Sequence, residues 1–101
     1  FVDNEEKILK VEFEGSLVIL GDVNDGAEVI AGENIIVLGD LRGLAHAGAK
    51  GNKEAIIAAS SIEAPQLRIS NIIKEREREE ILESTQKTYA YVDADGKMEL
   101  E

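Results

Sequence analysis

Three short segments carry residues of the kinds that bind phosphate or calcium, and each lacks part of the required pattern. In Gly43–Lys50 a lysine follows a glycine-containing stretch, but an alanine separates the last glycine from the lysine and no hydroxyl residue follows. Asp22–Gly26 and Asp93–Gly96 lack the ligand spacing and the closing glutamate of a calcium loop. We interpret the two aspartate-containing segments as turns, and we expect neither a nucleotide, nor a metal, nor any other cofactor.

The residues that could act as nucleophile or base also stand without partners. His46 is the single histidine, and a general base needs a group that positions it. No recognisable activating context surrounds the serines at 60, 61 and 70, and the absence of cysteine excludes a thiol nucleophile. The sequence therefore predicts no catalytic residue and no enzyme.

Four polar residues recur at a spacing of 18. Asp22 corresponds to Asp40, and Asn24 corresponds to Arg42. If this spacing is one coil of a stacked structure, the four residues line one edge. An arginine there can bind a partner's carboxylate through its planar fork, or it can pair with Asp40 or Asp22 of its own chain. Both readings remain open from the sequence.

Composition narrows the classes of partner. The chain has 101 residues and a formal net charge of -10, with 11 basic against 21 acidic residues. This charge argues against unaided binding to nucleic acid or to an anionic membrane, since each requires a basic surface. No apolar run approaches the roughly 20 residues that span a bilayer, and the first residues do not resemble a signal peptide. We expect a cytoplasmic protein and one domain over 1–101.

An internal repeat predicts how the polar edge is built. Residues 15–32 align with 33–50, with Leu-Gly-Asp shared and aliphatic residues exchanged across 17–20 and 35–38. Short apolar runs ended by Gly-Asp read as strands followed by turns, and a unit this short leaves no room for helices of ordinary length. The arithmetic fits an all-β, three-sided (triangular) β-helix with about 18 residues per coil. Ile, Val, Leu and Ala fill its narrow interior and glycines occupy its corners.

The coils are expected over 14–73, with a weaker third copy after a short insertion at 50–53. Residues 74–86 are a charged segment that we interpret as a loop with helical tendency. Residues 87–101 read as strand, turn and strand, and a stretch at 8–13 alternates like a strand. These ends are expected to cap or extend the stack.

The runs Leu20–Gly32, Asn34–Gly39 and Leu41–Ala49 resemble the C-terminal domain of the bacterial septum-site-determining MinC family, and Gly51–Ala59 and Ala64–Ser70 continue the likeness. The resemblance implies a right-handed triangular β-helix that forms a homodimer and binds the MinD ATPase, which recruits it to the membrane. It also implies a role in inhibiting FtsZ polymerisation, shared with an N-terminal domain that this chain lacks. The mechanism is then binding without a chemical step.

The predicted site residues follow from this reading. Candidates for MinD binding are Asp22, Asn24, Asp40, Arg42, Gly43, Leu44 and His46. Candidates for a flat apolar dimer face are Leu67, Ile69 and Ile72. The family's Arg-Ser-Gly-Gln motif is missing, because its positions hold Glu6-Lys-Ile-Leu9 here. Two alternatives are a bactofilin-like scaffold that polymerises through its ends and a hexapeptide-type acyltransferase.

Overall fold

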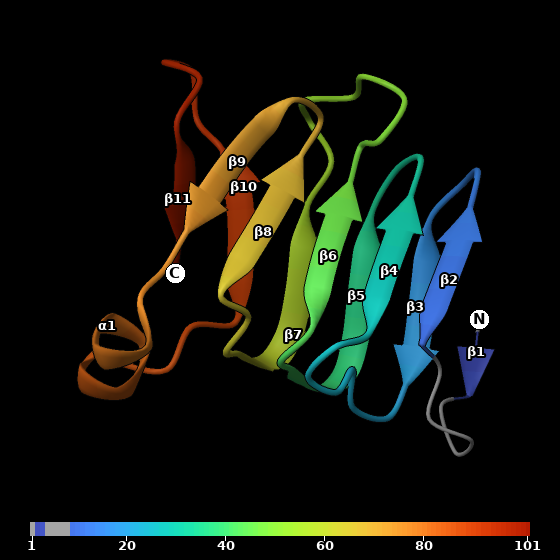
Figure 1. Ribbon diagram of the computed structural model, residues 1–101. Coiled ribbons are helices and arrows are strands. Elements are labelled where there is room, and N and C mark those ends of the chain that lie inside the picture. Colours follow the sequence, from blue (N-terminus) through green and yellow to red (C-terminus); the bar gives the residue numbers. More distant parts are fainter. Residues whose placement is uncertain (1, 4–8) are drawn as a thin grey trace.

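The computed structural model describes residues 2–3 and 9–101. Its described residues form short strands and one short helix (Figure 1). The elements, in chain order, are β1 (Val2–Asp3), β2 (Lys10–Phe13), β3 (Leu17–Leu20), β4 (Glu28–Ala31), β5 (Ile35–Leu41), β6 (Leu44–Ala47), β7 (Ile57–Ile62), β8 (Gln66–Ile69), β9 (Ile72–Glu75), α1 (Arg78–Glu83), β10 (Tyr89–Val92) and β11 (Met98–Leu100).

Alternate strands of the coil belong to two sheets. One sheet has six strands in the order β1-β3-β5-β7-β10-β11, and the other has five in the order β2-β4-β6-β8-β9. The chain runs up a strand of the five-stranded sheet, crosses to the six-stranded sheet, runs down and returns one coil further along (Figure 1). The coil is right-handed, as parallel strand crossovers almost always are. The prediction of a right-handed all-β β-helix is confirmed.

The third side of the triangle is narrow. Val23 forms a parallel bridge with Leu41, and Leu41 pairs with Ile62 of the next coil. The backbone N–H of Val23 donates to the carbonyl of Asp40, and that of Glu63 donates to the carbonyl of Leu41. The third side therefore consists of a residue or two per coil, at the edge where the chain passes from the six-stranded to the five-stranded sheet.

The spacing of 18 holds for some sides of the coil and fails for others. Leu17 pairs with Ile35, as the repeat predicts, but Glu28 pairs with Leu44, 16 residues later. The corner from Val23 to Glu28 advances five residues along the chain, whereas the equivalent corner of the next coil, from Leu41 to Leu44, advances three. The second corner is therefore tighter. The next pairing, Ile35 with Ile57, spans 22 residues because the insertion near Lys50 lengthens that coil.

Inward-facing side chains stack in ladders along the coil axis. Val29, Ala45 and Leu67 form one such ladder, and Ile35 stacks on Ile57. All five are buried. Because every second residue of a strand faces inward, a narrow interior is filled by aliphatic residues alone.

Antiparallel strands end the parallel stack at its C-terminal side. β9 pairs with β8, and β10 pairs with β7 and then with β11, all antiparallel. The strand–turn–strand expected over 87–101 is present. The charged segment contains a short helix, α1, in keeping with its expected helical tendency, and its first two residues belong to the end of strand β9. Arg76, only 6% exposed, joins the two by donating to the carbonyl of Ile62 and the hydroxyl of Ser84.

Candidate interaction surfaces

Arg42 lies at the narrow corner among three carboxylates from successive coils. Its guanidinium is 2.8 Å from Asp40 Oδ2, 3.7 Å from Asp22 Oδ2 and 3.8 Å from Glu63 Oε1. The side chains are between a third and a half exposed, so the attraction is screened by water. The sequence left open whether Arg42 binds a partner's carboxylate or pairs within its own chain. In the structure it forms intramolecular ion pairs, and Glu63 is one partner that the sequence repeat did not indicate.

The backbone of the same corner is closely packed from coil to coil. A Cβ placed on Gly43 would lie 2.5 Å from the carbonyl oxygen of Ala27 and 2.6 Å from that of Asn24. Asn24 begins the turn of the coil below, where its carbonyl accepts the N–H of Ala27. Gly43 is therefore required by close approach of two backbones, which limits its predicted part in binding to shaping the corner.

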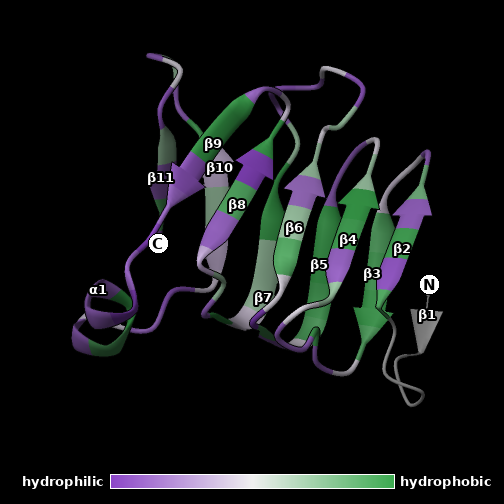
Figure 2. Ribbon diagram, viewed as in Figure 1, coloured by the Kyte–Doolittle hydropathy of each residue, from purple (hydrophilic) through white to green (hydrophobic). Residues whose placement is uncertain are grey.

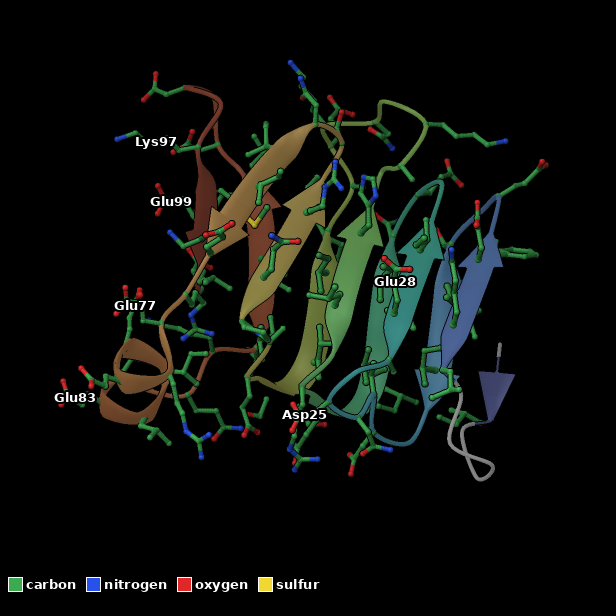
Figure 3. All side chains as sticks on the ribbon, in the orientation of Figure 1. Asp25, Glu28, Glu77, Glu83, Lys97 and Glu99 are labelled. Carbon is green, nitrogen blue, oxygen red and sulfur yellow. The ribbon has the colours of Figure 1, made fainter. Side chains whose placement is uncertain are left out.

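Helix α1 lies beside this corner and leaves an open groove of about 490 Å³. Asp25, Arg42 and Glu63 line one side, and Ile81 and Leu82 of α1 line the other. Asp25 projects from the lower corner in Figure 3. The groove adds apolar side chains to an otherwise charged edge.

The last two residues predicted to bind MinD lie on a different surface. Leu44 and His46 face outward from β6 in the five-stranded sheet, as Glu28 does from β4 (Figure 3). The His46 ring is fixed, because its Nε2 donates to the carbonyl of Ser70 at 2.8 Å. The structure therefore separates the predicted residues into the corner with Asp22, Asp40 and Arg42, and the adjoining sheet face.

The predicted dimer face requires correction. Leu67 and Ile69 are fully buried in the interior of the coil, and Ile72 packs partly against the same core. The alternating pattern of β8 places Leu67 and Ile69 at its inward-facing positions. Side chains already packed inside the chain are unavailable to a second copy.

A different apolar face lies on the outside of the six-stranded sheet. We call it the outer apolar face and define it as Val18, Leu20, Ile36, Leu38 and Ala58. Leu38 is 58% exposed. In Figure 2, β3 and most of β5 are green, whereas β2 and β8 carry purple residues between green ones. The signal was in the sequence, because strands that are apolar at successive positions need burial on both faces.

Tyr89 extends the outer apolar face, since it pairs with Ala58 across β10 and β7. Its ring stacks on that of Tyr91 with centroids 5.3 Å apart. The Tyr91 hydroxyl donates to Glu101, and that carboxylate raises the pKa of the phenol, with a smaller contribution from desolvation. The phenol therefore stays neutral under ordinary conditions.

Positions 6–8, where the family's Arg-Ser-Gly-Gln motif would fall, lie outside the described residues. Leu9, the last of these positions, is exposed. Among the residues that the structure describes, no group of His, Asp and Glu side chains is arranged to hold a metal ion. Within the same residues, no helix is long and apolar enough to cross a membrane.

Stacked coils with a charged corner and a broad apolar face define a class of protein, a β-helical domain with surfaces suited to protein contacts. The chain belongs to the family described as septum formation inhibitor MinC, C-terminal domain, whose model matches residues 9–101. Members of this family act in the selection of the division site.

Individual proteins similar to this chain carry the same family name. The chain is 45% identical over 91 residues to the septum site-determining protein MinC of Bacillus subtilis (strain 168), a match covering 90% of this chain and 40% of the relative. It is 63% identical over 60 residues to a probable MinC of Geobacillus thermodenitrificans (strain NG80-2), covering 59% and 26%. The chain thus spans less than half the length of these relatives.

A solved structure described as the MinC:MinD cell division protein complex of Aquifex aeolicus resembles the fold. The TM-score is 0.82 at 37% sequence identity, covering 91% of this chain and 74% of that one.

Proposed function

We propose that this chain is a non-catalytic interaction domain that forms a homodimer, binds a MinD-type ATPase and positions an inhibitor of FtsZ polymerisation. The observation that carries the proposal is the similarity, over nine tenths of the chain, to a MinC chain solved as a complex with MinD. The surfaces described above supply two distinct faces, one for each of the protein contacts.

The outer apolar face is the proposed dimer interface. Exposed apolar patches of this kind mark protein contacts, and a face repeated on each protomer suits a twofold pair. Leu38→Asp would place a charge at its most exposed position. We expect this variant to sediment as a monomer where the parent is a dimer. Leu82→Asp on α1, where the leucine is 72% exposed, is the matched control and should remain dimeric. A dimeric Leu38→Asp protein would remove this face from the interface.

The corner around Arg42, together with Leu44 on the adjoining sheet, is the proposed MinD contact. A dimer bound to a dimeric MinD on a membrane gains avidity, which compensates for weak single contacts. Pull-down with ATP-loaded MinD tests the proposal as a whole: the parent should be retained with ATP and lost without it. No retention in either condition would contradict it.

The same pull-down tests the residues. Arg42→Glu reverses the positive charge that lies among Asp22, Asp40 and Glu63, and this variant should lose MinD. Lys97→Glu, in the turn between β10 and β11, is the control for charge alone. Thermal unfolding of both variants separates lost binding from lost folding. Retention of Arg42→Glu at the parent's level would remove the corner from the MinD contact.

Localisation is proposed to follow from MinD. A net charge of -10 repels an anionic bilayer, so a cytoplasmic chain would reach the membrane only through its partner. Co-sedimentation with anionic vesicles should therefore require both MinD and ATP. Direct sedimentation with vesicles alone would contradict this route.

End-to-end polymerisation, as in a bactofilin-like scaffold, is disfavoured by the C-terminal end of the stack. β9 and the β10–β11 pair turn antiparallel there, so the parallel hydrogen-bond ladder does not continue into another copy. An acyltransferase reading would need His46 as base, a role that would fall to Nδ1 because Nε2 donates to a backbone carbonyl.

A further inference from the structure

Arg68 occupies an unusual position on the outward face of the five-stranded sheet. It lies between His46 of β6 and Ile73 of β9 in a row across neighbouring strands. Its Nε atom is buried and has no hydrogen-bond partner within the part of the chain that the structure describes. A buried donor left unsatisfied costs free energy, and the cost is larger for a charged group.

The direct neighbours of Arg68 in this row are His46 and the apolar Ile73. Ile30 pairs with His46, and Ile73, which is 50% exposed, pairs with Arg68 from the other side. Leu44, 37% exposed, adjoins them. The row Ile30, His46, Arg68 and Ile73 therefore presents one cation within an apolar strip, which we call the Arg68 strip.

Two carboxylates beside the Arg68 strip are engaged with other partners, and a third, Glu12, follows Ile30 at the far end of the row from Arg68. Glu28 is 3.7 Å from the ammonium of Lys10, and Glu75 accepts a hydrogen bond from the side-chain amide of Gln66. Both lie on outward positions of the same sheet, beside the strip rather than in it. In a chain with ten excess negative charges, the strip is a local exception that favours an anionic group.

We propose that the Arg68 strip docks a segment of a protein partner that presents a carboxylate between apolar side chains. The planar guanidinium suits a carboxylate, which it can hold with two parallel hydrogen bonds from its two terminal nitrogens. Ile30 and Ile73 provide apolar contact on either side. The strip lies on the opposite sheet from the outer apolar face, so it remains open in the proposed dimer. The inference does not depend on binding to MinD.

The test uses a short probe and a signal specific to arginine. The probe is the peptide acetyl-Ile-Asp-Ile-amide, with acetyl-Ile-Asn-Ile-amide as the uncharged control. The ¹⁵N–¹H signal of arginine Nε is followed as each peptide is added to the intact ¹⁵N-labelled chain. We expect the Arg68 Nε–H signal to shift with the Asp peptide, and to require at least about tenfold more of the Asn peptide for the same shift.

Two variants locate the effect. Arg68→Gln replaces the guanidinium with a shorter, uncharged amide and should weaken binding of the Asp peptide about tenfold or more, judged from the backbone amides of Ile30 and Ile73. Arg78→Gln on α1 removes an arginine elsewhere and should leave binding unchanged. Equal responses to the two peptides, or an unchanged response in Arg68→Gln, would overturn the proposal. Conversion of the parent dimer to a monomer by Arg68→Gln would also overturn it, because the strip would then be covered by a second copy.

Discussion

The carboxylate of Asp22 accepts a hydrogen bond from the backbone N–H of Asp40, at a distance of 2.7 Å. The two residues occupy the same corner of successive coils, and Arg42 contacts both carboxylates. Asp22 thus acts within the fold as a cap for the next coil. This relationship explains why an aspartate recurs at this corner without any need for a ligand.

The cap can be tested by comparing two replacements of Asp22. Asp22→Ala removes the acceptor for the Asp40 N–H and one ion-pair partner of Arg42. We expect a loss of about 1 kcal/mol in the free energy of unfolding, measured by urea titration. Asp22→Asn keeps an oxygen acceptor and should lose less. If the two variants were equally stable, the hydrogen bond would not be the source of the effect.

Gly43 is predicted to be sensitive to a single methyl group. Gly43→Ala would bring a Cβ against two backbone carbonyls of the preceding coil, so the corner must move. The expected cost is about 1–3 kcal/mol in urea unfolding. Gly15→Ala is the control, because the nearest atom to its added Cβ belongs to the end of the Phe13 side chain. Equal midpoints for the two variants would contradict the close approach at Gly43.

Two adjacent residues of β5 separate folding from association. Ile35 faces the interior and is fully buried, whereas Ile36 lies on the outer apolar face. In the Leu38→Asp background, Ile35→Ala should cost about 2–5 kcal/mol of unfolding free energy. Ile36→Ala should change it by no more than about 0.5 kcal/mol there. In the parent, Ile36→Ala should instead raise the dimer dissociation constant. A large loss of monomer stability from Ile36→Ala would contradict this assignment of the two faces.

The turn between β10 and β11 carries a pH dependence of known sign. The backbone N–H of Lys97, and next that of Asp95, donate to the Asp93 carboxylate and hold its pKa below the ordinary value of 3.8. A folded-state pKa that is lowered stabilises the fold above the unfolded pKa, and this contribution is lost as pH falls through the folded value. The stability difference between the parent and Asp93→Asn should therefore shrink below about pH 4. A difference independent of pH would refute this account.

The fold was predictable because its signals are local and repeated. Aliphatic runs at 17–20 and 35–38, each ended by Gly-Asp, specify strands and corners at a regular interval. The variable coil length was not predictable. The corner at Leu41–Leu44 is two residues shorter than the corresponding corner of the preceding coil, but small apolar residues still align at an offset of 18, so the alignment hides the change. The repeat placed Ala27 opposite Ala45, whereas the structure pairs Val29 with Ala45.

The surfaces were harder to predict than the strands. Asp22, Asp40 and Arg42 meet at one corner as the repeat indicates, but Glu63 joins them from a coil beyond an irregular insertion. The dimer-face prediction for Leu67 and Ile69 was wrong, and alternation alone does not say which face of a strand is inside. The continuous apolar runs of β3 and β5 indicated an apolar outer face, because a strand with one solvent-exposed face alternates apolar and polar residues.

The antiparallel strands at the C-terminal side make the two ends of the stack different, and this difference should set the order in which the strands open. Among the described strands, β2 is hydrogen-bonded to β4 alone, whereas β6 and β8 each have a neighbouring strand on both sides. In a quasi-one-dimensional stack, stability accumulates from neighbour to neighbour, so loosening begins where a neighbour is missing. Amide hydrogens should then exchange in order along the axis, first in β2 and last in β6 and β7, as a zipper opens from its unfastened end.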